Sequence, residues 1–243
     1  MRYSGVFTTF VCLSMLLGCQ SQQQASTSGP ASGSKSGSPS STKAAPGGET
    51  GQVVPDELKH EGYQYFGIGG KSLQLEMVNS ANKTTSSGSQ MFELEGVKDG
   101  EAKFTQTWTG GLNALGSSVV AVRKDGVYTI ENAGREVKPP QLELPADPKP
   151  GFSWSGSSSF YLPDQTKVDQ QTKLTIVSTE RVKTKGGEFD ALKVKVTGTL
   201  NYGGKKNPVD MTYWYVKEVG PVRVEFSSVV KNKPAKVTIQ AVK

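Results

Sequence analysis

The sequence predicts an all-β protein whose folded part, from residue 55 to the end, is one large, curved antiparallel sheet that forms an open half-barrel. Aromatic and β-branched residues recur there in short alternating runs, and this period is typical of strands with one buried face. Asp-Gly pairs separate several of the runs, and such a pair between two alternating runs is a strong hairpin signal. No long amphipathic helical pattern competes with this prediction.

Ten segments are expected to be strands. They cover residues 72–78, 89–97, 102–109, 118–124, 127–132, 173–182, 189–200, 209–216, 222–230 and 236–242. The alternation is cleanest late in the chain, where Leu192 and Val194 share one face and Lys193 lies on the other. The proline-rich segment 138–151 is expected to be an extended connector, and short helical turns are expected only near residues 55–61 and 112–115.

The N-terminus has the features of a secretory signal peptide over residues 1–18. Arg2 supplies the positive charge, and an apolar stretch follows between residues 6 and 17. That stretch is shorter than the ~20 apolar residues needed to cross a bilayer as a helix, and it fits the hydrophobic region of a signal peptide.

The apolar stretch ends in Leu16-Leu17-Gly18-Cys19, which resembles the bacterial lipobox. The resemblance implies cleavage before Cys19 and attachment of lipid, palmitate included, to that cysteine, so that the protein is anchored to a membrane. Gln20 rather than Asp follows the cysteine, which implies the outer membrane in a cell that has two membranes. An ordinary signal peptide that happens to contain a cysteine is the alternative.

Residues 19–54 are expected to be a disordered tether that carries the lipidated cysteine. From residue 20 onward the segment is rich in Gly, Ser, Gln and Pro and contains no aromatic residue, Leu, Ile or Met. It therefore has little to offset the entropy lost on ordering. A coil of this length spans roughly 30–35 Å. A segment that folds on a partner is the alternative, and residues 55–243 are expected to be a single domain.

The formal net charge of +6 is a mild excess spread along the expected strands. A solvated surface explains it, and a surface for anionic lipid or an envelope polymer is the alternative. The sequence lacks an arginine cluster or a nucleic-acid recognition motif, so nucleic acid is not an expected partner. Cys12 and Cys19 are the only cysteines, which leaves the domain without a disulfide framework.

Three segments between residues 144 and 230 resemble a pattern found in bacterial envelope proteins of the DUF3108-like group. They are PGFSW at 150–154, GEFDALKV at 187–194 and YWYVKEVGPV at 213–222. The resemblance implies an antiparallel sheet similar to the curved half-barrels of the lipoprotein carriers LolA and LolB. The chain departs from the pattern at Lys217-Glu218, where relatives often have Pro and Gly, and the group has no established activity to transfer.

The usual signatures of catalysis are missing from the sequence, and no enzyme, cofactor or metal is expected. The run Gly67–Ser72 has Tyr65 where a phosphate loop needs Gly, and a strand pattern follows it. His60 is the only histidine and is expected to be exposed, and no Gly-x-Ser-x-Gly motif accompanies it. The acidic residues are too scattered to identify a facing pair of the kind that glycosidases use.

Five aromatic residues in expected strands are the candidate ligand-binding residues: Trp108, Trp154, Tyr213, Trp214 and Tyr215. Core packing or cross-strand pairing is the competing explanation. In a strand, Trp214 points away from the face shared by Tyr213 and Tyr215, so the five cannot all line one groove.

These observations favour a membrane-anchored envelope lipoprotein without enzymatic activity. Its sheet is expected to bind an apolar or amphiphilic ligand or to assist envelope assembly. A structural or protein-interaction module with a packed core and no pocket is the alternative. The sequence indicates no oligomeric state.

Overall fold

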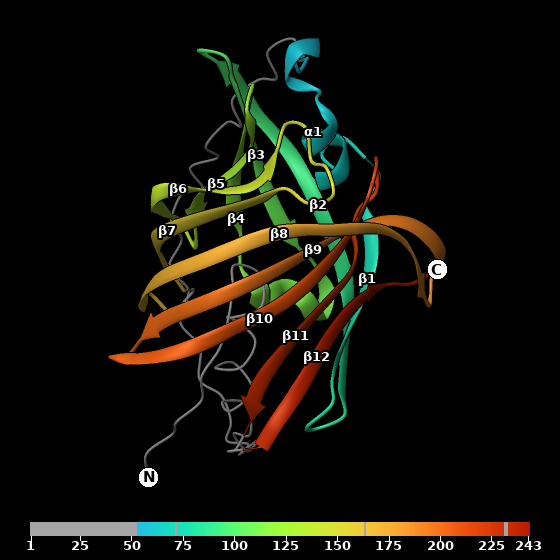
Figure 1. Cartoon of the computed structure of the whole chain (residues 1–243), viewed down its shortest axis with the longest axis vertical. Coiled ribbons are helices and arrows are strands. Elements are labelled where there is room, and N and C mark those ends of the chain that lie inside the picture. Colours follow the sequence, from blue (N-terminus) through green and yellow to red (C-terminus); the bar gives the residue numbers. More distant parts are fainter. Residues whose placement is uncertain (1–52, 71, 163, 231–232) are drawn as a thin grey trace, which may run out of the picture.

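The computed structural model describes residues 53–70, 72–162, 164–230 and 233–243. Within them, twelve antiparallel strands form a closed barrel, and three short helical segments accompany it (Figure 1). The expected signal peptide, the expected lipidation at Cys19 and the expected tether up to residue 52 lie outside the described residues, so the anchor stays a prediction.

The strands follow one another around the barrel in sequence order. They are β1 (Leu73–Asn79), β2 (Thr84–Lys98), β3 (Glu101–Trp108), β4 (Ser118–Arg123), β5 (Gly126–Asn132), β6 (Arg135–Pro145), β7 (Ser153–Tyr161), β8 (Lys167–Thr184), β9 (Gly187–Tyr202), β10 (Lys205–Val216), β11 (Gly220–Val230) and β12 (Lys233–Ala241). β1 pairs with β2 and also with β12, where Leu75 lies opposite Ala241. The prediction of an antiparallel all-β fold is confirmed. The prediction of an open half-barrel is wrong, because the first and last strands pair with each other and leave no free edge.

Two of the twelve strands, β6 and β7, lie outside the ten expected segments, although Trp154 of β7 was expected to be in a strand. β6 runs through Pro139-Pro140, inside the segment expected to be a connector, and β7 is rich in serine rather than in β-branched residues. A single ladder pair, Lys138 opposite Ser159, joins the two strands. We call this boundary the β6–β7 seam.

Side chains fill the β6–β7 seam where backbone pairing is missing. The indole N–H of Trp154 donates to the carbonyl oxygen of Leu142 over 3.0 Å. The buried amide of Gln170 donates to Gln141 Oε1 at 2.9 Å and to Ser158 Oγ at 2.7 Å. Side-chain hydrogen bonds therefore replace part of the ladder between these strands.

The helical segments η3 (Asp56–Leu58), α1 (Glu61–Phe66) and η4 (Gly110–Leu115) are short. α1 packs against β5, β6, β10 and β11, whereas η4 packs against β2 and β3 and buries Leu112 and Leu115. α1 lies toward the upper end of the barrel in Figure 1. Within the described part of the chain, no helix has the length and apolar character that a membrane crossing requires.

His60 caps α1, so the expectation that it is exposed is wrong. Its Nδ1 accepts the backbone N–H of Tyr63 at 3.1 Å, and its Nε2 lies 2.9 Å from the carbonyl oxygen of Arg123. The imidazole is half-buried, and this burial lowers its pKa. The helix ends at Gly67, which has a φ of 79°.

The main core fills the barrel with inward-facing side chains of every strand. Leu192, Val194 and Val196 are buried in β9 as their alternation predicts, while Lys193 and Lys195 stay partly exposed. A second, smaller core forms a separate cluster. It consists of Val182, Ala191, Trp214, Val222 and Ala241.

The tip of the β8–β9 hairpin, residues 179–191, covers this second core, and we call it the hairpin arm. Figure 1 shows β8 and β9 running out to the end of the barrel that carries the C-terminus. The N–H of Gly186 donates to the carbonyl oxygen of Ala241 over 2.9 Å, and Arg223 donates to the carbonyl oxygen of Lys183 over 3.0 Å. Lys185 forms an ion pair with Glu76 of β1. The arm therefore joins β8 and β9 to strands that are not their neighbours.

Candidate functional site

The interior of the barrel contains a partly open cavity of about 40 Å³, and this cavity is the candidate site. Its apolar wall includes Phe66 of α1, Leu75 of β1, Val224 of β11 and Ile239 of β12. Residues of β2 to β6 supply the polar wall opposite. The cavity therefore has one apolar and one polar side.

Aromatic rings form part of the cavity wall. Tyr213 and Tyr215 both point inward from β10, and their stacked rings lie 5.4 Å apart between centroids. Phe66 stacks on the other side of Tyr215 with centroids 6.3 Å apart. Burial raises the pKa of Tyr215 well above its usual value, and the nearby carboxyl of Glu143 adds to this effect. The phenol is therefore neutral at ordinary pH.

Glu143 is the acidic residue of the polar wall. The hydroxyl of Thr129 donates to its Oε1 over 2.8 Å. Burial raises the pKa of Glu143 from 4.5 to about 7, against the opposing effect of the Thr129 hydrogen bond. The residue keeps some exposed surface, and because it lines the cavity, part of that surface faces the cavity. Strongly raised carboxyl pKa values in cavities are associated with functional sites.

Amides and hydroxyls complete the polar wall. Gln90 and Gln106 are each 4% exposed, and both line the cavity. Ser118 donates to Gln106 Oε1 over 2.6 Å, which holds one of these amides in place. Such side chains are depleted in barrel cores unless they are hydrogen-bonded, because burying an unpaired polar group is costly.

Three of the five candidate aromatic residues, Trp108, Tyr213 and Tyr215, line the cavity. Trp154 is packed against the main core and bonded to Leu142 at the β6–β7 seam, and it does not line the cavity. Trp214 belongs to the second core and points away from the face that Tyr213 and Tyr215 share. The structure thus separates the candidates as strand alternation requires. That any of them binds a ligand stays a prediction.

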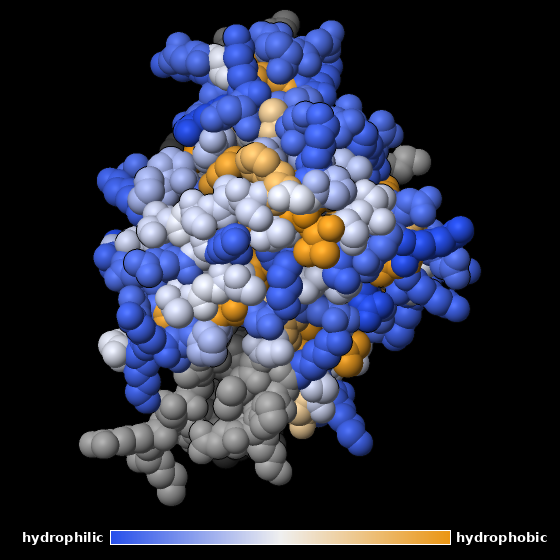
Figure 2. Space-filling model, viewed as in Figure 1, coloured by the Kyte–Doolittle hydropathy of each residue, from blue (hydrophilic) through white to orange (hydrophobic). Residues whose placement is uncertain are grey.

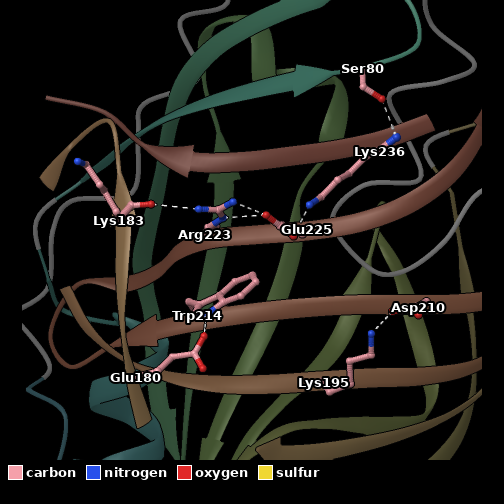
Figure 3. Close-up of polar contacts among 9 residues, drawn as sticks. All are labelled: Ser80, Glu180, Lys183, Lys195, Asp210, Trp214, Arg223, Glu225 and Lys236. Atoms are coloured by element: carbon pink, nitrogen blue, oxygen red, sulfur yellow. Dashed lines mark hydrogen bonds and ion pairs between the residues drawn. The ribbon is translucent and has the colours of Figure 1, made fainter. Parts of the chain in front are cut away.

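The surroundings of Trp214 explain its place outside the cavity. Its indole N–H donates to Glu180 Oε1 of the hairpin arm over 2.8 Å. The cationic groups of Lys193 and Arg223 each lie 5.5 Å from its ring centroid. Figure 3 shows Trp214 beside Glu180, with Arg223 and Glu225 on the next strand. These contacts attach the arm to the barrel. They give Trp214 a structural role and do not indicate a ligand site around it.

Glu143 was absent from the sequence-based candidates. It lies in the segment expected to be a connector, where the prolines concealed a strand. In the structure the β5–β6 register shifts at this residue, since Val127 pairs with Leu144 and Tyr128 with Leu142. Simple strand alternation therefore does not assign Glu143 to a face, and an isolated carboxylate gives no spacing motif, so its place in the cavity could not be predicted.

The outer surface offers a shallow alternative site. An open depression of about 420 Å³ lies over β7, β8 and β9, among the exposed side chains of Ser155, Ser157, Gln171, Lys173 and Thr197. Figure 2 shows the face over β8 to β11 as hydrophilic to neutral, with apolar residues in small separate groups. In the described part of the chain, no three His, Cys, Asp or Glu side chains are grouped to hold a metal ion.

Three solved structures are similar to this chain. A presumed lipoprotein from Parabacteroides distasonis is 18% identical, with a TM-score of 0.47 over 71% of this chain and 93% of that one. A presumed exported protein with a YmcC-like fold from Bacteroides fragilis is 12% identical, with a TM-score of 0.40 over 72% and 96%. The hypothetical lipoprotein YmcC from Escherichia coli is 10% identical, with a TM-score of 0.36 over 75% and 88%.

No protein-family model matches the chain, and no curated protein matches it either. The resemblance to the DUF3108-like group and to LolA and LolB therefore stays a prediction.

Proposed function

We propose that this chain is a membrane-anchored envelope lipoprotein without enzymatic activity, and that its barrel binds a small apolar or amphiphilic ligand. The lipobox-like sequence ending at Cys19 supports the anchor. Lipid on that cysteine holds the barrel outside the cytoplasm, on the outer membrane in a cell with two membranes. Assistance in envelope assembly follows if the ligand is an envelope component.

The two-sided cavity is the observation that carries the binding proposal. Closed barrels of about eight strands fill their interior with side chains. Here the cavity instead joins stacked tyrosines and an apolar wall to Glu143 and two buried glutamines. Ligand sites are mostly apolar with a few well-placed polar groups, and this cavity has that composition.

The volume of the cavity limits the ligand. A cavity of about 40 Å³ has room for a few waters. The cavity therefore takes a small molecule or one end of a larger one. A lipid-sized ligand requires the surrounding side chains to move.

Native mass spectrometry of the full chain, purified in mild detergent, tests the binding proposal. We expect a reproducible additional mass. A smaller fraction of a Tyr213→Leu variant should carry it, because Tyr213 lines the cavity. A Val177→Ala variant is the matched control, since Val177 is 49% exposed. A clean ligand-free mass in every preparation, with no uptake of a hydrophobic dye, would contradict the proposal.

The anchor is tested separately through Cys19. A Cys19→Ser variant should lose radiolabelled palmitate and move from the detergent phase to the aqueous phase on Triton X-114 separation. A Cys12→Ser variant should behave like the parent chain, because Cys12 lies within the expected signal peptide. Equal labelling of the parent and the Cys19→Ser variant would exclude lipidation at this residue.

A structural or protein-interaction module is the second candidate function. The observation that favours it is the small volume of the cavity within a barrel that is otherwise well packed. A chain that carries no ligand but captures a defined envelope partner would favour this candidate over the first.

A further inference from the structure

We propose that the cavity recognises a primary ammonium group on a short apolar stem, with Glu143 as its counter-ion. The inference rests on the proposed function, since it names the ligand class of the same cavity. It starts from Glu143, whose carboxylate accepts one hydrogen bond, from Thr129 at 2.8 Å, and forms no ion pair with a lysine or arginine of the described residues.

A cation is the partner that such a carboxylate lacks. A buried charge is costly unless it is paired and hydrogen-bonded. An ammonium group brings three donors and no acceptor, so it can bond Glu143 and still reach a neighbouring oxygen. The aromatic faces of Tyr213 and Tyr215 favour a cation as well. An anionic ligand would meet the charge of Glu143 without any compensating basic residue among those that line the cavity.

The apolar wall fixes the size of the stem. Phe66, Leu75, Val224 and Ile239 face the polar wall across a cavity of about 40 Å³. This volume accommodates only a few non-hydrogen atoms, since it has room for a few waters. An ammonium group with one to three carbons therefore fits without displacement of side chains.

Glu143 is the group that controls the charge of the cavity. The other titratable residues that line it are Tyr213 and Tyr215 of β10, and burial keeps Tyr215 neutral by raising its pKa. α1, β1, β11 and β12 contribute no titratable side chain to the cavity. Since the pKa of Glu143 is about 7, the cavity is mostly neutral at pH 5.5 and mostly anionic at pH 8.

Titration of the full chain with three probes that share a short carbon chain tests the inference: propylammonium, propanol and the slightly larger propionate. Binding is followed by NMR chemical shifts of the cavity residues, over millimolar concentrations, because a ligand of four atoms binds weakly at best. At pH 8 we expect propylammonium to bind at least tenfold more tightly than propanol and propionate to bind least. At pH 5.5 the preference for propylammonium should fall severalfold.

A Glu143→Gln variant should bind propylammonium and propanol equally at both pH values. An Asp210→Asn variant is the matched control, since Asp210 is an exposed acid paired with Lys195 on the outer surface, and it should keep the preference. If Glu143→Gln does not fold, the pH dependence of the parent chain still decides the question.

The failure of the inference differs from the failure of the proposed function. Equal binding of the three probes to the parent chain, or a preference that survives Glu143→Gln, would overturn the ammonium assignment and leave ligand binding intact. If none of the probes binds and a hydrophobic dye is also excluded, both proposals are wrong.

Discussion

The indole nitrogen of Trp214 lies 2.8 Å from Oε1 of Glu180, so a hydrogen bond joins β10 to β8 across the intervening strand β9. Figure 3 shows the two side chains meeting on the face of the sheet that the hairpin arm covers. The same carboxylate accepts a hydrogen bond from Lys193, and both partners lower its pKa. The contact therefore holds the arm and the barrel together through a charged acceptor.

Replacement of Trp214 by Phe should destabilise the fold by about 2 kcal/mol. The substitution removes a hydrogen bond to a charged group, which is worth about 1.5–3 kcal/mol, and it keeps most of the buried ring. Urea unfolding at neutral pH measures the change. A Glu180→Gln variant retains an acceptor and should lose less. Unchanged stability of Trp214→Phe would show that the arm is not held by this bond.

Replacement of Gly198 by Ala should destabilise the barrel by about 3 kcal/mol. Gly198 has a φ of 153°, and an added Cβ would lie 2.1 Å from the carbonyl oxygen of Gln171 on the paired strand. The backbone must then move, which places the change among the severe class of substitutions. Thermal unfolding monitored by circular dichroism measures it.

Gly204→Ala is the control for Gly198→Ala. Gly204 also has a positive φ, 74°, but an added Cβ meets nothing within 4 Å. We expect a loss of about 1 kcal/mol there, from the backbone conformation alone. Equal losses for the two variants would contradict the steric argument.

The stability of the protein should fall between about pH 4.5 and pH 7 because of Glu143. Its pKa rises from 4.5 in the unfolded chain to about 7 in the fold, so the folded state binds the proton more tightly. The stability gained in the protonated form is fully present below pH 4.5 and is lost as the pH rises through 7. The loss is up to about 3 kcal/mol, since one pKa unit corresponds to about 1.4 kcal/mol.

Urea unfolding at pH 4.5 and pH 8 checks this contribution against a Glu143→Gln variant. The free energy of unfolding of the parent chain, relative to that of the variant, should be lower at pH 8 than at pH 4.5. Comparison with the variant cancels the contributions of other titrating groups. A difference that does not depend on pH would mean that Glu143 titrates normally.

Loss of the imidazole of His60 should destabilise α1 and its packing. The side chain caps Tyr63 and contacts the carbonyl oxygen of Arg123, and His60→Ala should lose about 1–2 kcal/mol, as other helix caps do. His60→Asn should recover part of this, because asparagine is a good N-cap. Chemical unfolding of the three chains at pH 8 makes the comparison, and equal stability of His60→Ala and the parent would refute the capping role.

The β6–β7 seam should be the first part of the barrel to exchange its amide hydrogens. Amides there have one ladder pair, Lys138 with Ser159, whereas the β8–β9 hairpin is paired along its length. Local opening is easiest where backbone hydrogen bonds are fewest. Trp154→Phe should accelerate exchange near Leu142 by removing the indole bond. Uniform exchange across both strand pairs would contradict this.

Alternation was sufficient to predict strands wherever β-branched residues carried it. Val222 to Phe226 and Val237 to Ala241 alternate in the sequence and are strands β11 and β12 in the structure. β6 escaped prediction because prolines usually exclude a strand from a sheet interior. In this barrel the prolines lie beside the sparsely paired seam, where few ladder bonds are lost.

Closure of the barrel could not be predicted from local patterns. It depends on the pairing of Leu75 with Ala241, residues far apart in the chain whose register no turn specifies. The residues that line the cavity could not be predicted for the same reason. The alternation separated Trp214 from Tyr213 and Tyr215, but only the closed barrel brings Glu143 opposite to them. Both barrel closure and the composition of the cavity therefore depend on long-range strand pairing, which local sequence patterns do not specify.

The pairing of β1 with β12 also sets the order of events as the chain is made. Until the last nine residues of the sheet, Lys233–Ala241, have emerged, β1 and β11 each lack a neighbour. A chain that emerges from its N-terminus must therefore wait for its C-terminal end before the fold is complete. During that interval its unpaired strands remain open to aggregation, so a truncation that removes β12 should expose the same two edges permanently.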